Sequence, residues 1–145
     1  MARPFWESKT LAEMSDAEWE SLCDGCGRCC LVVLQEEETD RYWETEIACR
    51  LFDAAKRRCT DYQRRRQRVK DCVRLTPDNA GALDWMPSTC AYRRLARRES
   101  LPKWHPLLTG DPQSVVRAGA ATAPGLLNER DVAPEDLEDH VTRPR

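Results

Sequence analysis

The sequence predicts a small, irregular α+β fold, in which short helices and one β-hairpin are held together by cross-links more than by a large core. The chain has 145 residues, a size typical of one domain. Its hydrophobic fraction of 41% counts all eight cysteines, and 33% of its residues are charged, so little apolar surface remains for a core. We therefore expect a single domain over residues 1–145, organised around a cysteine-ligated metal site.

A short helix is predicted before the first cysteine. Ser15 and Glu18 have the spacing of a capping box, in which each side chain binds the backbone N–H of the other residue. Trp19 and Leu22 would then lie on the inner face of the helix. The helix leads directly to Cys23.

A β-hairpin is predicted next. The apolar residues 31–34 form a strand, the polar residues 36–41 a turn, and residues 42–47 a return strand. Pairing of the two strands would bring Cys49 back towards the cysteines that precede the first strand.

The second half of the chain has weaker signals. We expect an exposed helix over 61–69, a brief helix starting at Thr76 and weakened by Gly81, and a helix with a basic outer face over 88–98. Proline and glycine predict an ordered, irregular loop over 101–112.

The end of the chain is acidic. Residues 134–141 are expected to form a last helix, and residues 142–145 to fray. This helix belongs to an acidic segment at about 126–141, in which Glu129 to Asp139 contain six acids and one arginine.

A basic segment balances these acids, since Lys56 to Lys70 contain eight basic residues and one acid. It could bind nucleic acid, but a solvated helix face is the interpretation we favour. No stretch has the roughly 18 apolar residues of a membrane span, and the N-terminal residues lack the apolar region of a secretory signal. We therefore expect a cytoplasmic protein with no membrane partner, in which thiols stay reduced and bind metal more readily than they form disulfides.

Four of the eight cysteines lie within one run of eight residues, Cys23-Asp24-Gly25-Cys26-Gly27-Arg28-Cys29-Cys30. Cys23-x2-Cys26 has the spacing of a zinc knuckle, and continuation to Cys29 gives the three-ligand spacing of iron–sulfur proteins. Both cofactors, zinc and an iron–sulfur cluster, stay open. Side chains of neighbouring residues diverge in extended backbone, so Cys29 and Cys30 are expected to have different roles.

The remaining cysteines, Cys49, Cys59, Cys72 and Cys90, could be further ligands or small buried apolar residues. Thiolate ligands carry negative charge, and Arg28, Arg50 and Arg58 lie beside cysteines and could offset it.

The other candidate residues give little support for catalysis. His105 could ligate metal, but a loop histidine bonded to backbone is the interpretation we favour. The chain has no phosphate loop, nucleophile elbow or His-Glu-x-x-His motif. We therefore favour a non-enzymatic metal-binding protein. The alternatives are a redox or iron-handling enzyme with a reactive cysteine, and a nucleic-acid-binding adaptor that uses residues 56–70.

The chain resembles a known family. The cysteine run, with Cys59-Thr60-Asp61-Tyr62 and Cys72, is similar to the CxxCxxCC family of zinc- or iron-chelating domains. Its YcgN-like bacterial branch also matches Trp19 to Gly27, Thr89 to Arg93 and Trp104 to Gly110. The resemblance implies a bacterial protein in which all eight cysteines are metal ligands. It implies no reaction.

Overall fold

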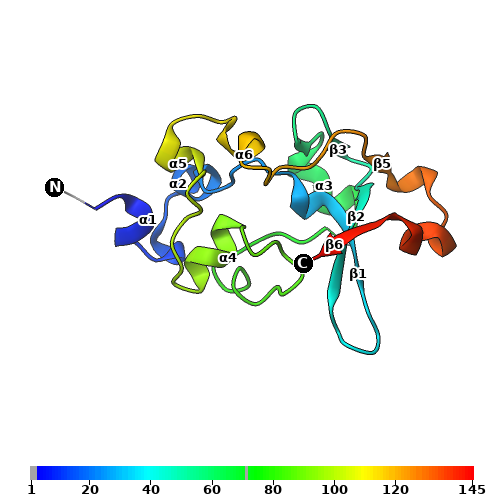
Figure 1. Ribbon diagram of the computed structural model, residues 1–145. Coiled ribbons are helices and arrows are strands. Elements are labelled where there is room, and N and C mark those ends of the chain that lie inside the picture. Colours follow the sequence, from blue (N-terminus) through cyan, green and yellow to red (C-terminus); the bar gives the residue numbers. More distant parts are fainter. Residues whose placement is uncertain (1–2, 71) are drawn as a thin grey trace. The chain divides into compact units, whose positions relative to one another are not determined.

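The computed structural model describes residues 3–70 and 72–145 and confirms a small α+β fold of short helices and mainly antiparallel strands (Figure 1). The chain forms two compact units, each built from separate stretches of sequence. Unit 1 contains residues 1–25 and 74–120, and unit 2 contains residues 26–73 and 121–145. No helix within the described residues has the length and apolar character needed to cross a membrane.

Unit 1 is helical. Its elements are α1 (Phe5–Ser8), η1 (Leu11–Glu13), α2 (Asp16–Ser21), α4 (Ala91–Ala96), α5 (Pro106–Thr109) and α6 (Ser114–Arg117), where η denotes a 3-10 helix. The predicted capping box is confirmed at the start of α2, where Ser15 and Glu18 bind each other's backbone N–H. Leu22, on the predicted inner face, is fully buried.

The core of unit 1 is a small cluster of apolar side chains. Leu22, Ala80, Ala91, Tyr92 and Leu101 form its buried centre. The Tyr92 hydroxyl donates to the Trp19 carbonyl at 2.7 Å, so that the ring packs against α2 while its polar atom stays satisfied. This cluster fixes the end of α2 and therefore the position of residue 22, just before the first cysteine.

Two sequence-based expectations in unit 1 need correction. Residues 77–82 form hydrogen-bonded turns and no helix. Thr76 and Asn79 bind each other's backbone N–H, as at the start of a helix, but the chain does not extend this start into a helix beyond Gly81, a poor helix former. The segment 101–112 is not wholly irregular. It contains α5, which has Pro106 at its first position and Gly110, with φ of 73°, at its C-cap.

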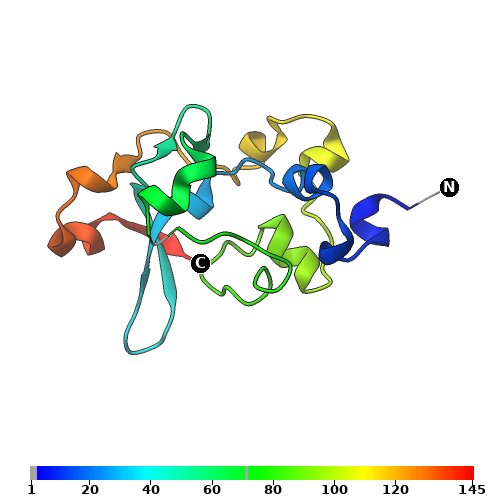
Figure 2. The ribbon, with the colours of Figure 1, turned by 180° about the vertical axis from the view of Figure 1, so that it is seen from behind.

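Unit 2 is built on a four-stranded sheet. Its strands are β1 (Leu31–Gln35), β2 (Tyr42–Ala48), β5 (Leu127–Asn128) and β6 (Val141–Pro144). The predicted hairpin is confirmed: β1 pairs with β2 antiparallel, and it appears from both sides in Figures 1 and 2. β2 is central, since β5 pairs with it in parallel and β6 antiparallel.

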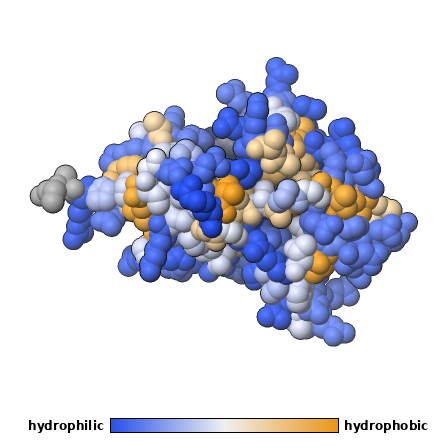
Figure 3. Space-filling model, turned by 45° about the horizontal axis from the view of Figure 1, so that its top comes forward, coloured by the Kyte–Doolittle hydropathy of each residue, from blue (hydrophilic) through white to orange (hydrophobic). Residues whose placement is uncertain are grey.

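Shorter elements complete unit 2. They are η2 (Arg28–Cys30), a second hairpin of β3 (Phe52–Asp53) and β4 (Arg58–Cys59), η3 (Tyr62–Arg64), α3 (Arg65–Arg68), η4 (Glu129–Asp131) and η5 (Pro134–His140). The expected helices over 61–69 and 134–141 therefore exist as short α and 3-10 turns. Hydrophobic residues appear as separate patches among hydrophilic ones on the face drawn in Figure 3.

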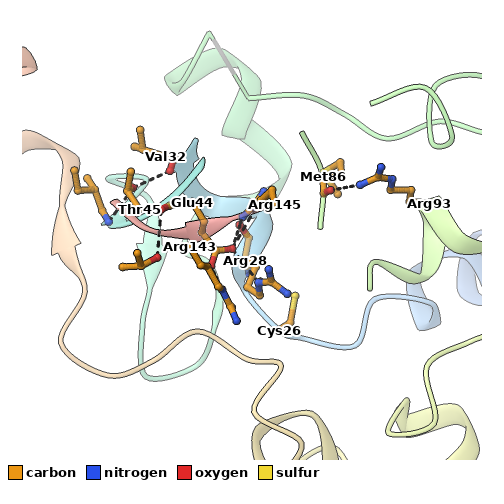
Figure 4. Close-up of polar contacts among 11 residues, drawn as sticks. Cys26, Arg28, Val32, Glu44, Thr45, Met86, Arg93, Arg143 and Arg145 are labelled. Carbon is orange, nitrogen blue, oxygen red and sulfur yellow. Dashed lines mark hydrogen bonds and ion pairs between the residues drawn. The ribbon is translucent and has the colours of Figure 1, made fainter. Parts of the chain in front are cut away.

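The last residues do not fray, contrary to expectation. They form β6, and the Arg145 side chain is fully buried. Its guanidinium donates to the Glu44 carboxylate at 2.9 Å and also to the Arg28 carbonyl. Arg28 and Arg143 bind the same carboxylate at 2.9 and 2.6 Å, so three guanidinium groups meet at Glu44 (Figure 4).

The Glu44 carboxylate is only 3% exposed. Burial alone would raise the pKa of Glu44, but the arginine contacts outweigh it, and the pKa lies below its ordinary value. A depressed carboxyl pKa contributes stability above the pKa of the unfolded chain, and this stability is lost as the pH falls through the folded pKa.

We expect Glu44→Gln to lower the free energy of unfolding by about 3–5 kcal/mol, because it leaves buried guanidinium groups without their counter-charge. Urea denaturation followed by circular dichroism measures this. The wild-type advantage should be largest above the ordinary glutamate pKa of 4.5 and shrink in more acidic solution. The control is Glu46→Gln on the same strand, whose side chain is 46% exposed, with an expected loss below about 1 kcal/mol. Equal stability of the two variants would contradict the role given to Glu44.

Candidate metal centre

The β1–β2 hairpin places two cysteines side by side. Leu31 pairs with Ala48 at the open end of the hairpin, so Cys30 and Cys49 are the next residues outward on the two chains. The Cys49 N–H donates to the Cys30 carbonyl at 2.8 Å. The prediction that the hairpin returns Cys49 to the cysteine run is therefore confirmed.

The β3–β4 hairpin adds a third cysteine. Cys59 pairs with Phe52, and the Phe52 N–H donates to the Cys49 carbonyl at 2.9 Å. The Thr60 N–H and hydroxyl both bind the Leu51 carbonyl at 2.7 Å and hold the two chains together beyond Cys59. The hairpin thus fixes Cys59 next to the Cys49 segment.

The cysteine run itself turns tightly at Gly27. This residue has a φ of 77°, which a side chain rarely tolerates, and a Cβ there would lie 2.6 Å from the Phe52 ring. The Arg28 N–H points at the Cys26 sulfur at 3.4 Å, and the Cys26 carbonyl accepts the Thr122 N–H at 2.8 Å. The run is therefore held on three sides by β3, by its own backbone and by the segment before β5.

The backbone at Cys29 and Cys30 is a 3-10 turn and is not extended. The expectation that the two side chains diverge is wrong for this reason. The Cys30 side chain hydrogen-bonds the Cys29 thiol, and this contact, followed by desolvation, raises the pKa of Cys29 well above its ordinary value. Cys29 is exposed as a whole residue, but its thiol is closely surrounded.

Electrostatic interactions connect these thiols to Cys72. Burial raises the pKa of Cys72, and the nearby Cys59 and Cys29 thiols raise it further. Burial also raises the pKa of Cys49, with smaller contributions from Glu129 and Cys59. Within unit 2, the thiol pairs that influence each other are therefore Cys29–Cys30, Cys49–Cys59, Cys59–Cys72 and Cys29–Cys72.

The charged groups around these thiols differ from those expected. The Arg28 guanidinium binds the buried Glu44 carboxylate. Arg50 binds the Glu129 carboxylate through its backbone N–H at 2.8 Å and its guanidinium at 3.1 Å. The guanidinium groups that favour thiolate are Arg145, which acts on Cys29, and Arg65, which acts on Cys72. Arg58 precedes Cys59 in β4 and is exposed.

Sequence reasoning missed Arg145, Arg65 and Glu129 as neighbours of the cysteines. Glu129 lies beside Cys49 although 80 residues separate them along the chain, and the Arg50 pairing that places it there has no local sequence signal. The sequence shows Arg65 as one of the basic residues between Lys56 and Lys70, and nothing in it singles out Arg65 as the neighbour of Cys72.

The other two predicted ligands belong to unit 1. Cys23 follows Leu22 and is exposed, whereas Cys90 is the N-cap of α4 and packs against the apolar core of its unit. The structure therefore links five of the eight thiols through pairwise electrostatic interactions, with Cys26 in the same unit.

No three His, Cys, Asp or Glu side chains within residues 3–70 and 72–145 converge closely enough to hold a metal ion. The donor set nevertheless fits a soft ion, because thiolate ligands select zinc, copper(I) and iron–sulfur clusters. Neighbouring thiols resist deprotonation together, and a bound cation would remove that resistance. The residues present are therefore suited to zinc or an iron–sulfur cluster.

His105 is fully buried and has both ring nitrogens engaged. Nδ1 accepts the Leu107 N–H at 3.0 Å, so it carries no proton. Nε2 lies 2.7 Å from the Leu22 carbonyl, an acceptor, and must therefore donate to it. His105 is a backbone-bonded loop histidine, as favoured from the sequence, and it anchors the residue that precedes Cys23.

This arrangement defines the class of protein: a small α+β protein with a cysteine cluster at the ends of its hairpins. Residues 22–91 match the CxxCxxCC family model, described as "Putative zinc- or iron-chelating domain". All eight cysteines lie within this match. The chain belongs to the CxxCxxCC family.

Bacterial relatives match nearly the whole chain and share the name UPF0260 protein. The relative from Azotobacter vinelandii is 53% identical over 138 residues, which cover 95% of this chain and 93% of the relative. The one from Rhizorhabdus wittichii is 52% identical over 139 residues, covering 96% and 94%. One from Caulobacter vibrioides is 50% identical over 137 residues, covering 94% and 83%. No solved structure matches the chain.

We expect His105→Phe to lower the free energy of unfolding by about 2–4 kcal/mol, because it leaves the buried Leu22 carbonyl and the partly buried Leu107 N–H without their partner. Urea denaturation followed by tryptophan fluorescence measures the loss. His140→Phe is the matched control, since the contact of His140 with the half-exposed Glu46 is at the surface and its loss should cost less than about 1 kcal/mol. A folded His105→Phe protein should keep its metal content, and loss of metal without loss of stability would identify His105 as a ligand instead.

Proposed function

We propose that this chain is a metal-binding protein that holds zinc or an iron–sulfur cluster through its eight cysteines, Cys23, Cys26, Cys29, Cys30, Cys49, Cys59, Cys72 and Cys90. The observation that carries the proposal is the gathering of cysteines from two hairpins and the CxxCxxCC run in unit 2. The family match supports it, because the matched residues begin just before Cys23 and end just after Cys90.

Cysteine ligation explains why so many thiols are placed on connecting segments. A turn such as Gly27 and two hairpin ends supply ligands from rigid positions, at little cost in loop closure. When zinc is bound, it supplies a tetrahedral centre that cross-links these segments, and an iron–sulfur cluster would do the same. The protein's own part is to place thiols on neighbouring segments of unit 2 and to provide cations such as Arg145 and Arg65.

A reactive-cysteine enzyme has less support. A nucleophilic cysteine needs a lowered pKa, so that the thiolate is present near neutral pH. The resolved pKa shifts of Cys29, Cys49 and Cys72 are all upward. We therefore propose a non-enzymatic role. As expected from the sequence, we place the protein in the cytoplasm, with a metal ion as its partner and nucleic acid as the less favoured alternative.

Metal and sulfide analysis after anaerobic purification tests the proposal directly. We expect either a colourless protein with about two zinc ions, as two four-cysteine sites require, or a brown protein with acid-labile sulfide. Addition of a chelator should lower the thermal midpoint, because metal-binding energy contributes to folding. A reduced protein that is folded, monodisperse and free of both metal and sulfide would refute the proposal.

The two adjacent cysteines can be tested separately. We expect Cys29→Ser and Cys30→Ser each to lose metal and stability to a similar extent, since the side chains touch and both are proposed as ligands. Ser21→Ala, a change of similar size on the surface of unit 1, is the control and should keep full metal content. If one cysteine variant retains metal and folds normally, that cysteine is not a ligand and its reactivity with a thiol reagent becomes the next measurement.

A further inference from the structure

A pocket of about 500 Å³ opens in unit 2, away from its cysteines. Leu34 of β1 and Trp43 of β2 are paired residues and therefore lie on the same face of the sheet. Together with Leu137 of η5 and Val141 of β6 they give the pocket an apolar lining. Val141 is 37% exposed, so this lining is open to solvent.

The rim of the pocket is acidic. Glu36 and Glu138 line it directly. The elements that supply them carry further exposed acids, namely Glu37, Glu38, Glu135, Asp136 and Asp139. Basic groups near these elements are fewer: Arg41 stands over the Trp43 ring, 5.4 Å from its centroid, His140 is 3.4 Å from Glu46, Arg143 of β6 binds Glu44, and Arg130 is exposed in η4. The excess of acids favours a ligand that joins one apolar group to several cations.

The segment Tyr62–Arg66 of the chain itself combines one aromatic ring with three arginines. Tyr62 is 48% exposed, and the Arg65 guanidinium lies 3.9 Å from the centroid of its ring. Arg64 and Arg66 flank it and are exposed. Among the described ion pairs, none joins this basic segment to the acids of η5.

We propose that this pocket binds the segment Tyr62–Arg66 of a second copy of the chain. The Tyr62 ring occupies the apolar lining, and Arg64 and Arg66 approach the acidic rim. Each copy offers both a pocket and a segment, so a twofold dimer satisfies both pairings at once. The attraction is largely between exposed charges, and salt therefore weakens it.

Sedimentation equilibrium of the metal-loaded, nuclease-treated full chain tests the proposal. At about 50 mM salt we expect a mass of twice the 16.7 kDa chain, and at about 500 mM salt a dissociation constant at least about tenfold weaker. Tyr62→Ala should weaken association about tenfold, because it removes the apolar anchor. A protein that stays monomeric at low salt overturns the proposal, as does association that nuclease treatment abolishes, which would identify nucleic acid as the occupant.

Charge-swap variants make the test specific. Arg64→Glu with Arg66→Glu, and separately Glu135→Lys with Glu138→Lys, should each be monomeric, because each opposes like charges across the contact. All four residues are exposed, so both variants should fold. An equal mixture of the two should regain the dimer mass, since each acidic segment then meets a basic pocket.

Arg74→Glu with Lys103→Glu is the matched control for the arginine variant, because it makes the same change in net charge as Arg64→Glu with Arg66→Glu at exposed positions of unit 1. It should dimerise like the wild type. Failure of the mixture to associate, or equal loss of association in the control, would show that net charge and not this pairing governs the mass.

Discussion

The contact of three guanidinium groups with one buried carboxylate is the constraint on which unit 2 depends. Glu44 lies in the central strand, Arg28 within the cysteine run, and Arg143 and Arg145 at and beyond the end of β6. One carboxylate cannot neutralise three cations, so the group is stable only while every arginine also finds other acceptors or solvent. Arg145 does so by donating to the Arg28 carbonyl, and the exposed Arg143 side chain reaches water. The polar network therefore fastens the cysteine run to the sheet where a larger protein would use apolar packing.

The two units show different solutions to the shortage of apolar residues. Unit 1 has a small apolar core around Leu22 and Tyr92. His105 borders it, and both of its ring nitrogens form hydrogen bonds to backbone. Unit 2 buries Glu44, Thr45 and Arg28 beside Ile47, which is costly unless each polar atom is paired. Its cysteines lie on the segments that leave this polar centre. A metal ion held by them would add the cross-links that its core does not provide.

Local features of the fold could be predicted from the sequence, and long-range ones could not. The capping box at Ser15 and the β1–β2 hairpin follow from signals a few residues apart, and so does the proximity of Cys49 to the cysteine run. The helix expected from Thr76 is a turn instead, because the start made by Thr76 and Asn79 is not extended into a helix beyond Gly81. The strand at 141–144 and the roles of Arg145 and Glu129 depend on partners about 80 to 117 residues away, which no pattern in one sequence reveals. The eight proposed ligands were visible as residues, but the contact between Cys29 and Cys30 required the 3-10 backbone.

The burial of Arg145 also sets an order of events during synthesis. The cysteine run leaves the ribosome early, whereas the guanidinium that binds the Arg28 carbonyl follows 117 residues later. At a translation rate of roughly 10 residues per second, about 10 s pass between synthesis of the cysteine run and synthesis of β6, which pairs with β2. During this interval six thiols of unit 2 are attached to an incomplete sheet, open to oxidation or to the wrong metal. A metal ion that bound these thiols early would protect them until the Arg145 guanidinium reached Arg28.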